Sequence, residues 1–178
     1  MAEPDDETRW IERSCLGDHE AFEALIRKYQ HMIHSLAYRM TGSLSDAEDL
    51  SQETFLRAYQ QISRFRGEAR FSSWLYQIAV NACLNWRKAT ERQQQLHEDW
   101  AGQEQTTVAA DRSLDEVRNA LMKLNPKQRA AVILTTYDGL NHADASRALG
   151  CSETTVSWRL FVARRKLRRM LGKREKDL

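Results

Sequence analysis

The sequence is poor in helix-breaking residues and in cysteine. Its 178 residues include only seven glycines and two prolines, which is too few for a collagen-like or largely disordered chain. The three cysteines, Cys15, Cys83 and Cys151, stand 68 residues apart and form no CxxC pair. We therefore expect small, buried or half-buried hydrophobic side chains at these positions, rather than disulfides or a zinc site.

Long apolar runs and catalytic signatures are also missing. No stretch approaches the roughly 18 consecutive apolar residues of a membrane span, and the charged first 30 residues contain no apolar core of a signal peptide. The chain has no glycine-rich phosphate loop, no HExxH and no GxSxG. These absences predict a cytoplasmic protein that does not insert into membranes, needs no cofactor or metal, and is not an enzyme.

Charge is plentiful and unevenly distributed. Residues 1–95 hold 12 basic and 14 acidic side chains (net −2), residues 96–117 hold one and six (net −5), and residues 118–178 hold 14 and five (net +9). A near-neutral first part, an acidic middle and a basic end indicate two functional units joined by a tether. The basic unit is a candidate for nucleic-acid binding.

Apolar residues recur at steps of three and four along most of the chain, which predicts an all-α fold. In the first part, N-caps at Asp18 and Ser45 mark the starts of two helices, and a third helix would begin near Ser72 or Ser73. Glu48 stands three residues after Ser45, as a capping-box partner would. These helices would form a compact bundle.

The periodic pattern fades in the middle of the chain. Residues 93–112 are rich in glutamine and acidic residues, and Trp100 is the only aromatic residue among them. This composition predicts a flexible acidic linker. The sequence thus predicts two small helical domains, residues 1–92 and 113–178, joined by that linker.

The second domain carries a helix-turn-helix pattern. Asn125 and Pro126 suit an N-cap and a first helical position. A short helix over His142–Leu149 would end at Gly150, and Ser152 would cap the final helix. Such a final helix enters the major groove of DNA, and its basic residues neutralise phosphates. No acidic residue interrupts the eight basic ones: Arg159, Arg164, Arg165, Lys166, Arg168, Arg169, Lys173 and Arg174.

Two residues of the final helix suggest how DNA would be recognised. Arg159 is expected to point away from Val156 and Leu160, where it could contact a guanine or a neighbouring phosphate. Trp158 could contact a thymine methyl group or brace the preceding helix. We expect the brace, because a fully exposed tryptophan is uncommon in a soluble monomer.

An acidic helix start lies near residue 46. Asp49, Gln52, Glu53 and Leu56 follow one another at helical spacing and form what we call the acidic ridge. The pattern leaves two interpretations open. In the first, which is the commoner case, the acidic residues complement the helix dipole. In the second, the ridge docks a partner helix.

Aromatic and basic residues alternate from Phe65 to Phe71. Exposed aromatic rings beside arginines can stack unpaired bases. Aromatic residues at helical spacing are more often part of the core, so we expect at least two of Phe71, Trp74 and Trp86 to be buried. Tyr76 lies off the inward stripe and is expected to be exposed.

These segments together resemble the extracytoplasmic-function (ECF) sigma factors of bacterial RNA polymerase, from about residue 18 to residue 170. The segments that resemble the region-two domain of that family are 46–55 (DAEDLSQETF), 65–67 (FRG) and 71–81 (FSSWLYQIAVN). The segments that resemble the region-four domain are 124–126 (LNP), 138–140 (DGL) and 149–156 (LGCSETTV).

The resemblance implies a transcription initiation factor that contacts core polymerase and two promoter elements. Docking on the β′ clamp helices would involve Asp46, Asp49, Leu50, Gln52, Glu53 and Phe55. Recognition and melting of the −10 element would involve Phe65, Arg66, Gly67, Arg70, Tyr76, Asn81, Arg87 and Lys88. Recognition of the −35 element would involve Ser152, Thr154, Thr155, Ser157, Trp158, Arg159, Phe161, Arg164, Arg165 and Arg168.

Further partners are implied by the resemblance alone. Region four would also touch the β flap, the linker would run near the active-site and RNA-exit path, and an anti-sigma factor would sequester the chain. The chain departs from the family pattern at residues 144–146, which are Asp-Ala-Ser instead of Glu-Ile-Ala. It also lacks the Lys or Arg often found at Ser157 and Val162, and the small residue usual at Trp158. The preferred −35 sequence therefore does not follow by analogy.

Two other functions stay open at the level of sequence. A free-standing helix-turn-helix regulator would bind operators unaided, but it would usually need a dimer seam, which the pattern does not show. A helical protein-binding adaptor is the second alternative, and the net charge of +9 over residues 118–178 argues against it.

Overall fold

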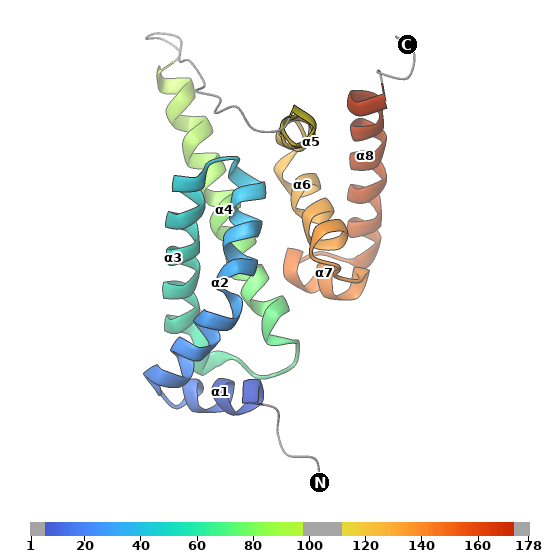
Figure 1. The fold of residues 1–178 in the computed structure, drawn as a ribbon. Helices are drawn as coiled ribbons and strands as arrows, with labels where there is room; N and C mark the ends of the chain where they lie inside the picture. The colour runs from blue at the N-terminus through green and yellow to red at the C-terminus, as the bar shows by residue number, and fades with distance from the viewer. Residues whose placement is uncertain (1–5, 98–111, 173–178) are drawn as a thin grey trace.

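A computed structural model describes residues 6–97 and 112–172, and within these ranges every regular element is helical, which confirms the predicted fold class (Figure 1). The first unit contains α1 (Asp6–Cys15), α2 (His19–Thr41), α3 (Leu44–Gln61), a 3₁₀ turn (Ile62–Arg64) and α4 (Phe71–His97). The second contains α5 (Arg112–Met122), α6 (Pro126–Val132), a π turn (Ile133–Tyr137), α7 (His142–Leu149) and α8 (Glu153–Leu171).

The helix ends follow local chemistry at most of the predicted positions. The Asp18 carboxylate accepts a hydrogen bond from the Ala21 amide (3.1 Å), and Gly42 ends α2 in the left-handed region with φ of 79°. Asn125 and Ser152 cap α6 and α8. These caps confirm the predictions because a cap depends only on a few neighbouring residues.

One predicted cap was wrong. Ser43, not Ser45, caps α3, and its hydroxyl accepts a hydrogen bond from the Asp46 amide (3.3 Å). Only Gly42 and Ser43 separate α2 from α3, so Ser45 already lies within the first helical turn and cannot pair with Glu48 as a capping box. The left-handed Gly42 is what makes so short a connection possible.

The sequence-based prediction also missed α1. Trp10 and Ile11 of α1 pack against the first core, while the Glu7 carboxylate pairs with Lys28 and accepts from the Tyr29 hydroxyl (2.7 Å). The frequent charges of this segment hid its apolar face. Helix α4 continues to His97, five residues into the predicted linker, and the rest of that linker, with Trp100, lies outside the described residues.

The two units pack against each other. Ala130, Ile133, Leu134 and Ala148 of the second unit are buried in the same core cluster as α2, α3 and α4. A separate cluster beneath α8 holds Leu121, Leu124, Val132, Val156, Leu160 and Ala163. Figure 1 accordingly shows α6 and α7 between α8 on the outer side and the helices of the first unit.

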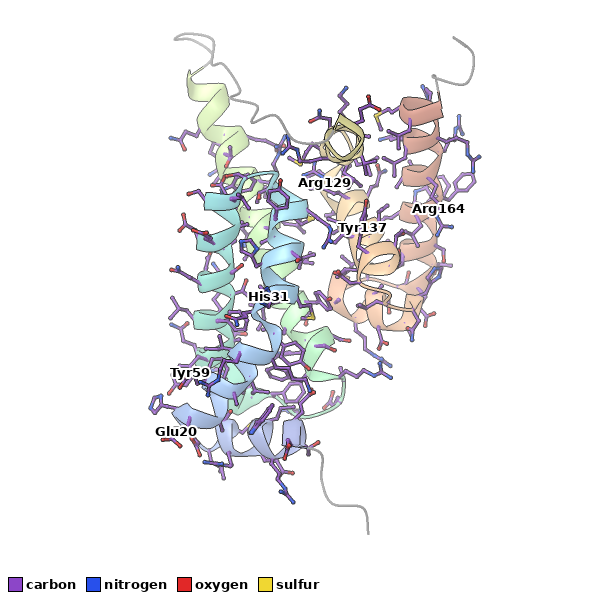
Figure 2. All side chains as sticks on the ribbon, in the orientation of Figure 1. Glu20, His31, Tyr59, Arg129, Tyr137 and Arg164 are labelled. Atoms are coloured by element: carbon purple, nitrogen blue, oxygen red, sulfur yellow. The ribbon has the colours of Figure 1, made fainter. Side chains whose placement is uncertain are left out.

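Arg129 joins the units at the top of this contact (Figure 2). Its side chain is 1% exposed, and its guanidinium donates to the carbonyl of Met40 in α2 and to the carbonyls of Leu121, Met122 and Leu124. Burial lowers the pKa of Arg129 to about 10, so the group stays charged at neutral pH. Four carbonyls thus replace the water that the charge has lost.

A second polar contact between the units lies at the end of the π turn. The Arg39 guanidinium sits 4.7 Å from the ring centre of Tyr137 and 3.9 Å from the Asp138 carboxylate. Burial raises the pKa of Asp138, although Arg39 and the nearby Tyr76 hydroxyl favour its ionised form. One oxygen of this carboxylate, Oδ2, is buried without a hydrogen-bond partner.

Tyr76 is therefore not the exposed ring that the sequence suggested, since it is only 3% exposed. It does lie off the stripe that packs within the first unit, but that side of α4 is covered by the second unit. Burial and the adjacent Asp138 both raise the pKa of Tyr76. In this arrangement the Tyr76 ring is not accessible to DNA.

Candidate polymerase and nucleic-acid interfaces

The acidic ridge lies along the outer side of α3. Asp49, Gln52 and Leu56 are exposed, while Glu53 is half-buried and pairs with Arg57 one turn later. Leu56 does not stand alone, because it also lines an apolar groove with Ile26 and Phe55, and contiguous exposed apolar surface marks contact sites. The ridge can therefore offer both charge and apolar area to a partner.

The other predicted docking residues are placed differently. Leu50 is buried in the first core, so a direct contact of its side chain with polymerase is contradicted. It lies next to Asp49 in sequence but about 100° around the helix, which turns it inward. Asp46 is half-buried and accepts a hydrogen bond from the Trp86 indole (3.2 Å), and Phe55 is half-buried against the core.

Beside the ridge, α2 and α3 form an apolar groove of about 500 Å³. Gln52, Leu56 and Tyr59 contribute from α3, and Tyr59 also donates to or accepts from His19 of α2 (2.8 Å). Sequence reasoning missed the α2 side of this groove, because it depends on how two helices pack. The complete lining is His19, Phe22, Glu23, Ile26, Gln52, Phe55, Leu56 and Tyr59.

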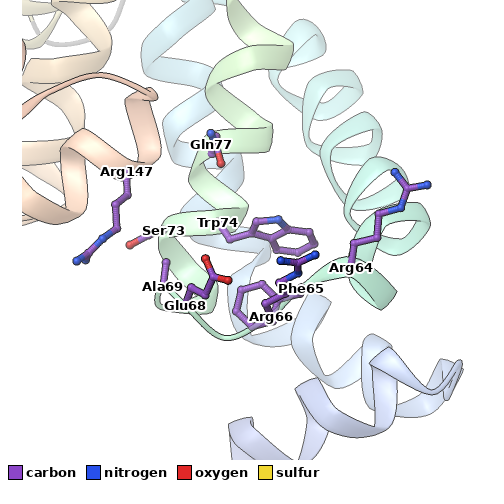
Figure 3. A pocket seen from close by; sticks show the side chains of 9 residues that line it. All are labelled: Arg64, Phe65, Arg66, Glu68, Ala69, Ser73, Trp74, Gln77 and Arg147. Carbon is purple, nitrogen blue, oxygen red and sulfur yellow. The ribbon is translucent and has the colours of Figure 1, made fainter.

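The loop before α4 lines a pocket of about 230 Å³ (Figure 3). Phe65 stands edge-on to Phe71 (5.5 Å between ring centres) and lies 5.3 Å from the Trp74 ring. Phe71 is buried, and Trp74 and Trp86 pack half-buried on the same core, which agrees with the expected core role of these rings. The complete lining is Arg64, Phe65, Arg66, Glu68, Ala69, Ser73, Trp74, Gln77 and Arg147.

Of the residues predicted to contact the −10 element, the pocket gathers only Phe65 and Arg66. Arg70 is highly exposed and lies 4.0 Å from Asp144 of α7. Farther along α4, Asn81 and Lys88 are exposed and Arg87 pairs with Glu91 (2.7 Å); these three do not line the pocket.

Sequence reasoning missed the contributions of Arg64, Trp74 and Gln77, and that of Arg147, to this pocket. Arg147 belongs to α7, in the other unit, and also pairs with Asp144 (3.0 Å). No local pattern could have placed it there. Three arginines and two aromatic rings around one cavity provide the combination that binds unpaired, phosphate-linked bases.

Helix α8 presents the basic surface that the sequence predicted. The Ser152 hydroxyl caps the helix by accepting from the Thr155 amide (3.2 Å). Ser152, Thr154 and Ser157 are exposed at its start. The exposed arginines of its second half are Arg164, Arg165, Arg168 and Arg169, and Figure 2 shows Arg164 pointing away from the protein.

The position of Trp158 contradicts the prediction that this side chain braces the preceding helix. It is 64% exposed and its ring stacks on that of Phe161, which is 58% exposed, with 5.9 Å between ring centres. Because Trp158 follows the buried Val156 by two residues, it lies about 200° around the helix, on the opposite side. Arg159 is half-buried rather than fully outward, and its guanidinium donates to the Cys151 sulfur (3.4 Å).

Comparison with known proteins finds a matching family for each of the two units. The family described as Sigma-70 region 2 matches residues 25–93, and Sigma-70, region 4 matches residues 114–167. The chain is 38% identical over 157 residues to the ECF RNA polymerase sigma factor SigM of Mycobacterium tuberculosis, covering 88% of this chain and 80% of SigM. It is 32% identical over 170 residues to SigW of Bacillus subtilis, covering 87% and 91%.

This chain belongs to the ECF sigma factors. It is therefore an initiation factor that binds core RNA polymerase and directs it to specific promoters, and a free-standing regulator is not favoured. Its fold resembles CnrH, solved with the cytosolic domain of CnrY, with a TM-score of 0.75 at 24% identity over 96% of this chain and 99% of that one.

A second solved structure shares the fold. The Bartonella quintana sigma factor RpoE, solved with the anti-sigma factor NepR, gives a TM-score of 0.71 at 23% identity over 86% of this chain and 98% of that one. In the part of this sigma factor that the structure describes, no helix has both the length and the apolar composition needed to cross a bilayer.

Proposed function

We propose that this ECF sigma factor divides its work between two domains. Residues 1–92 dock on core polymerase and recognise and melt the −10 element, residues 113–178 recognise the −35 element, and residues 93–112 link them. The family matches over residues 25–93 and 114–167 support this division. The sigma factor would act in the cytoplasm, with the polymerase, and without a catalytic site of its own.

Docking is assigned to the exposed part of the acidic ridge. Asp49 and Gln52 are the exposed polar residues, and Leu56 adds apolar area that continues into the α2–α3 groove. Asp46, Glu53 and Phe55 contribute as half-buried neighbours, and Leu50 supports the ridge from inside. The β′ clamp helices would lie along this side of α3.

The −10 element is assigned to the pocket and to α4. The pocket of Figure 3 would receive an unpaired base beside the Phe65 and Trp74 rings, with Arg64 and Arg66 near its phosphates. Gly67 and Arg70 lie next to lining residues in the chain, and Asn81, Arg87 and Lys88 would follow the strand along α4. Because α7 brings Arg147 to this pocket, the two domains would have to separate somewhat on promoter DNA.

We assign recognition of the −35 element to α8. The exposed basic surface of this helix is the main observation that supports the proposal. This is a basic helix in a helix-turn-helix. Its start is capped by Ser152, and its arginines Arg164, Arg165, Arg168 and Arg169 are exposed. Ser152, Thr154, Thr155, Ser157, Trp158, Arg159 and Phe161 would lie toward the bases. Arg164, Arg165 and Arg168 would contact phosphates. The β flap would touch the same domain.

The test combines the sigma factor with purified core polymerase and labelled promoter duplexes. We expect co-migration with core, and sequence-specific promoter binding and transcription only when core is present. Binding of one duplex sequence at nanomolar concentration by the isolated chain would support the free regulator instead. Failure to bind core would contradict the docking assignment.

An anti-sigma factor is proposed as a further partner. The two structural neighbours were solved with a bound partner, the cytosolic domain of CnrY in one and the anti-sigma factor NepR in the other. The apolar α2–α3 groove beside the docking ridge gives such a protein a place to compete with polymerase. Such a partner should prevent the sigma factor from co-migrating with core.

A further inference from the structure

Two large aromatic rings project from the outer side of α8. Trp158 and Phe161 are 64% and 58% exposed and stack on each other with an angle of 27° between their planes. Exposing two adjacent aromatic rings is unfavourable for a soluble protein unless a partner covers them. Their mutual stacking also restricts their rotation, so they would lose little conformational entropy on binding.

The charge around the rings indicates which class of partner covers them. The cap at Ser152 precedes them, and Arg164, Arg165 and Arg168 follow on the exposed side of the same helix. Residues 118–178 carry a net charge of +9. A polyanion is therefore favoured over an apolar protein helix as the partner. The rings also lie on the part of the final helix that contacts base edges when a helix-turn-helix binds DNA.

The chemistry of the rings limits what they can recognise. The phenyl ring of Phe161 has no hydrogen-bonding group, and the indole of Trp158 has a single N–H donor. The major groove offers one apolar group in unmodified DNA, the 5-methyl of thymine. Neighbouring positions do not compensate, because Ser157 is short and Val162 is apolar and half-buried. No single side chain at these positions has the two donors of a bidentate contact to guanine.

We propose that the Trp158–Phe161 pair determines −35 specificity by packing on the 5-methyl groups of one or two adjacent thymines. This inference rests on the proposed assignment of α8 to the −35 element. Removing one buried methyl group should weaken binding about fourfold, since burial of such a group contributes about that factor.

The experiment uses holoenzyme, formed from core polymerase and the full chain, with −35 elements selected from a randomised library. We expect thymine to be enriched at one or two adjacent positions. Replacing each such thymine by deoxyuridine keeps the base pair and its O4 acceptor and removes only the methyl group. This replacement should weaken holoenzyme binding about fourfold per position.

Matched variants decide whether the rings sense that methyl group. In Trp158→Ala or Phe161→Ala holoenzyme, thymine and deoxyuridine promoters should bind equally at the affected position. Arg168→Ala should bind all promoters more weakly but keep the preference for thymine over deoxyuridine. All three side chains are exposed, so we expect the three variants to fold. Melting temperatures equal to that of the wild type would show this.

The outcomes separate this inference from the proposed function. If Arg168→Ala weakens promoter binding but wild-type holoenzyme ignores the methyl group, the −35 role stands and the aromatic contact is wrong. If Trp158→Ala weakens core binding without DNA, the rings cover a protein, and the inference is also overturned. If none of the α8 variants changes promoter binding, the −35 assignment itself fails.

Discussion

The second unit of this sigma factor has two different faces. Charged and aromatic residues contact partners within the protein on one face and are exposed to solvent on the other. On the inner face, turned to the first unit, Arg129 has four carbonyl partners, and Tyr137 and Asp138 meet Arg39. On the outer face, Trp158, Phe161 and several arginines of α8 face solvent. Both faces belong to a domain of about 60 residues.

This difference in exposure separates residues that stabilise the folded structure from residues that are accessible to a ligand. A buried polar group must find its partners within the protein, since an unsatisfied one costs about 1–3 kcal/mol. An exposed group has no such requirement. Inner-face substitutions should therefore change the free energy of unfolding, and substitutions on the exposed surfaces should change binding alone. The following experiments test that division.

The largest effect is expected at Arg129. Arg129→Ala leaves four carbonyls without their donor and should lower the free energy of unfolding by about 4 kcal/mol, measured by urea denaturation. Lys127 lies exposed on the same helix, so Lys127→Ala removes an equal charge as a control and should change stability by less than about 0.5 kcal/mol. Equal stability of the two variants would show that the buried guanidinium contributes nothing.

A smaller effect, on binding instead of folding, is expected at the acidic ridge. The double substitution Asp49→Ala with Gln52→Ala should weaken binding to core polymerase by about 2–3 kcal/mol, the range of interface hot spots. Helicity and unfolding should not change, because both side chains are exposed. Glu12→Ala, at an exposed acidic position of α1, is the control in the same titration. An unaltered affinity of the double variant would remove the ridge from the docking surface.

Arg159 lies between the two faces, because it is half-buried and bonded to Cys151. If it reaches a base, Arg159→Ala should cost about 1–3 kcal/mol of promoter binding and relax the preference at one −35 position. Transcription from a randomised −35 library measures this. Arg165→Ala should instead weaken all promoters alike and reduce the salt slope by about one. An even loss across the library would assign Arg159 to a phosphate.

The smallest effect is expected at Asp138. Burial raises its pKa in the folded state, so the folded protein binds the proton more tightly than the unfolded chain. The associated stabilisation is complete below the ordinary carboxyl pKa of about 3.9 and is lost as pH rises through the folded-state pKa. Asp138→Asn cannot titrate. Its stability should fall less than that of the wild type as pH rises above about 4.

Unfolding curves of wild type and Asp138→Asn at a series of pH values measure that difference. A steeper fall for the variant than for the wild type would contradict the sign, and would mean that the contact with Arg39 outweighs burial at this carboxylate. Parallel curves would mean that the carboxylate titrates alike in the folded and unfolded chains.

Much of the fold was predictable because it depends on neighbours in the chain. Helical periodicity, the caps at Asp18, Asn125 and Ser152, and the left-handed Gly150 each involve a few consecutive residues. The helix-turn-helix and its basic helix follow from the same local rules. The failure at Ser45 is instructive, because the cap moved by two residues when the helices met across a connection of only Gly42 and Ser43.

Residue pattern therefore determined the all-α fold, most helix ends and the basic character of α8. Tertiary structure alone decided which side of each helix is covered. Tyr76 and Leu50 became buried, Trp158 became exposed, and Arg147 came to line a pocket of the other unit. The physical reason is that burial depends on which helix packs against each face, and periodicity reveals one apolar stripe without showing what covers the remaining surface.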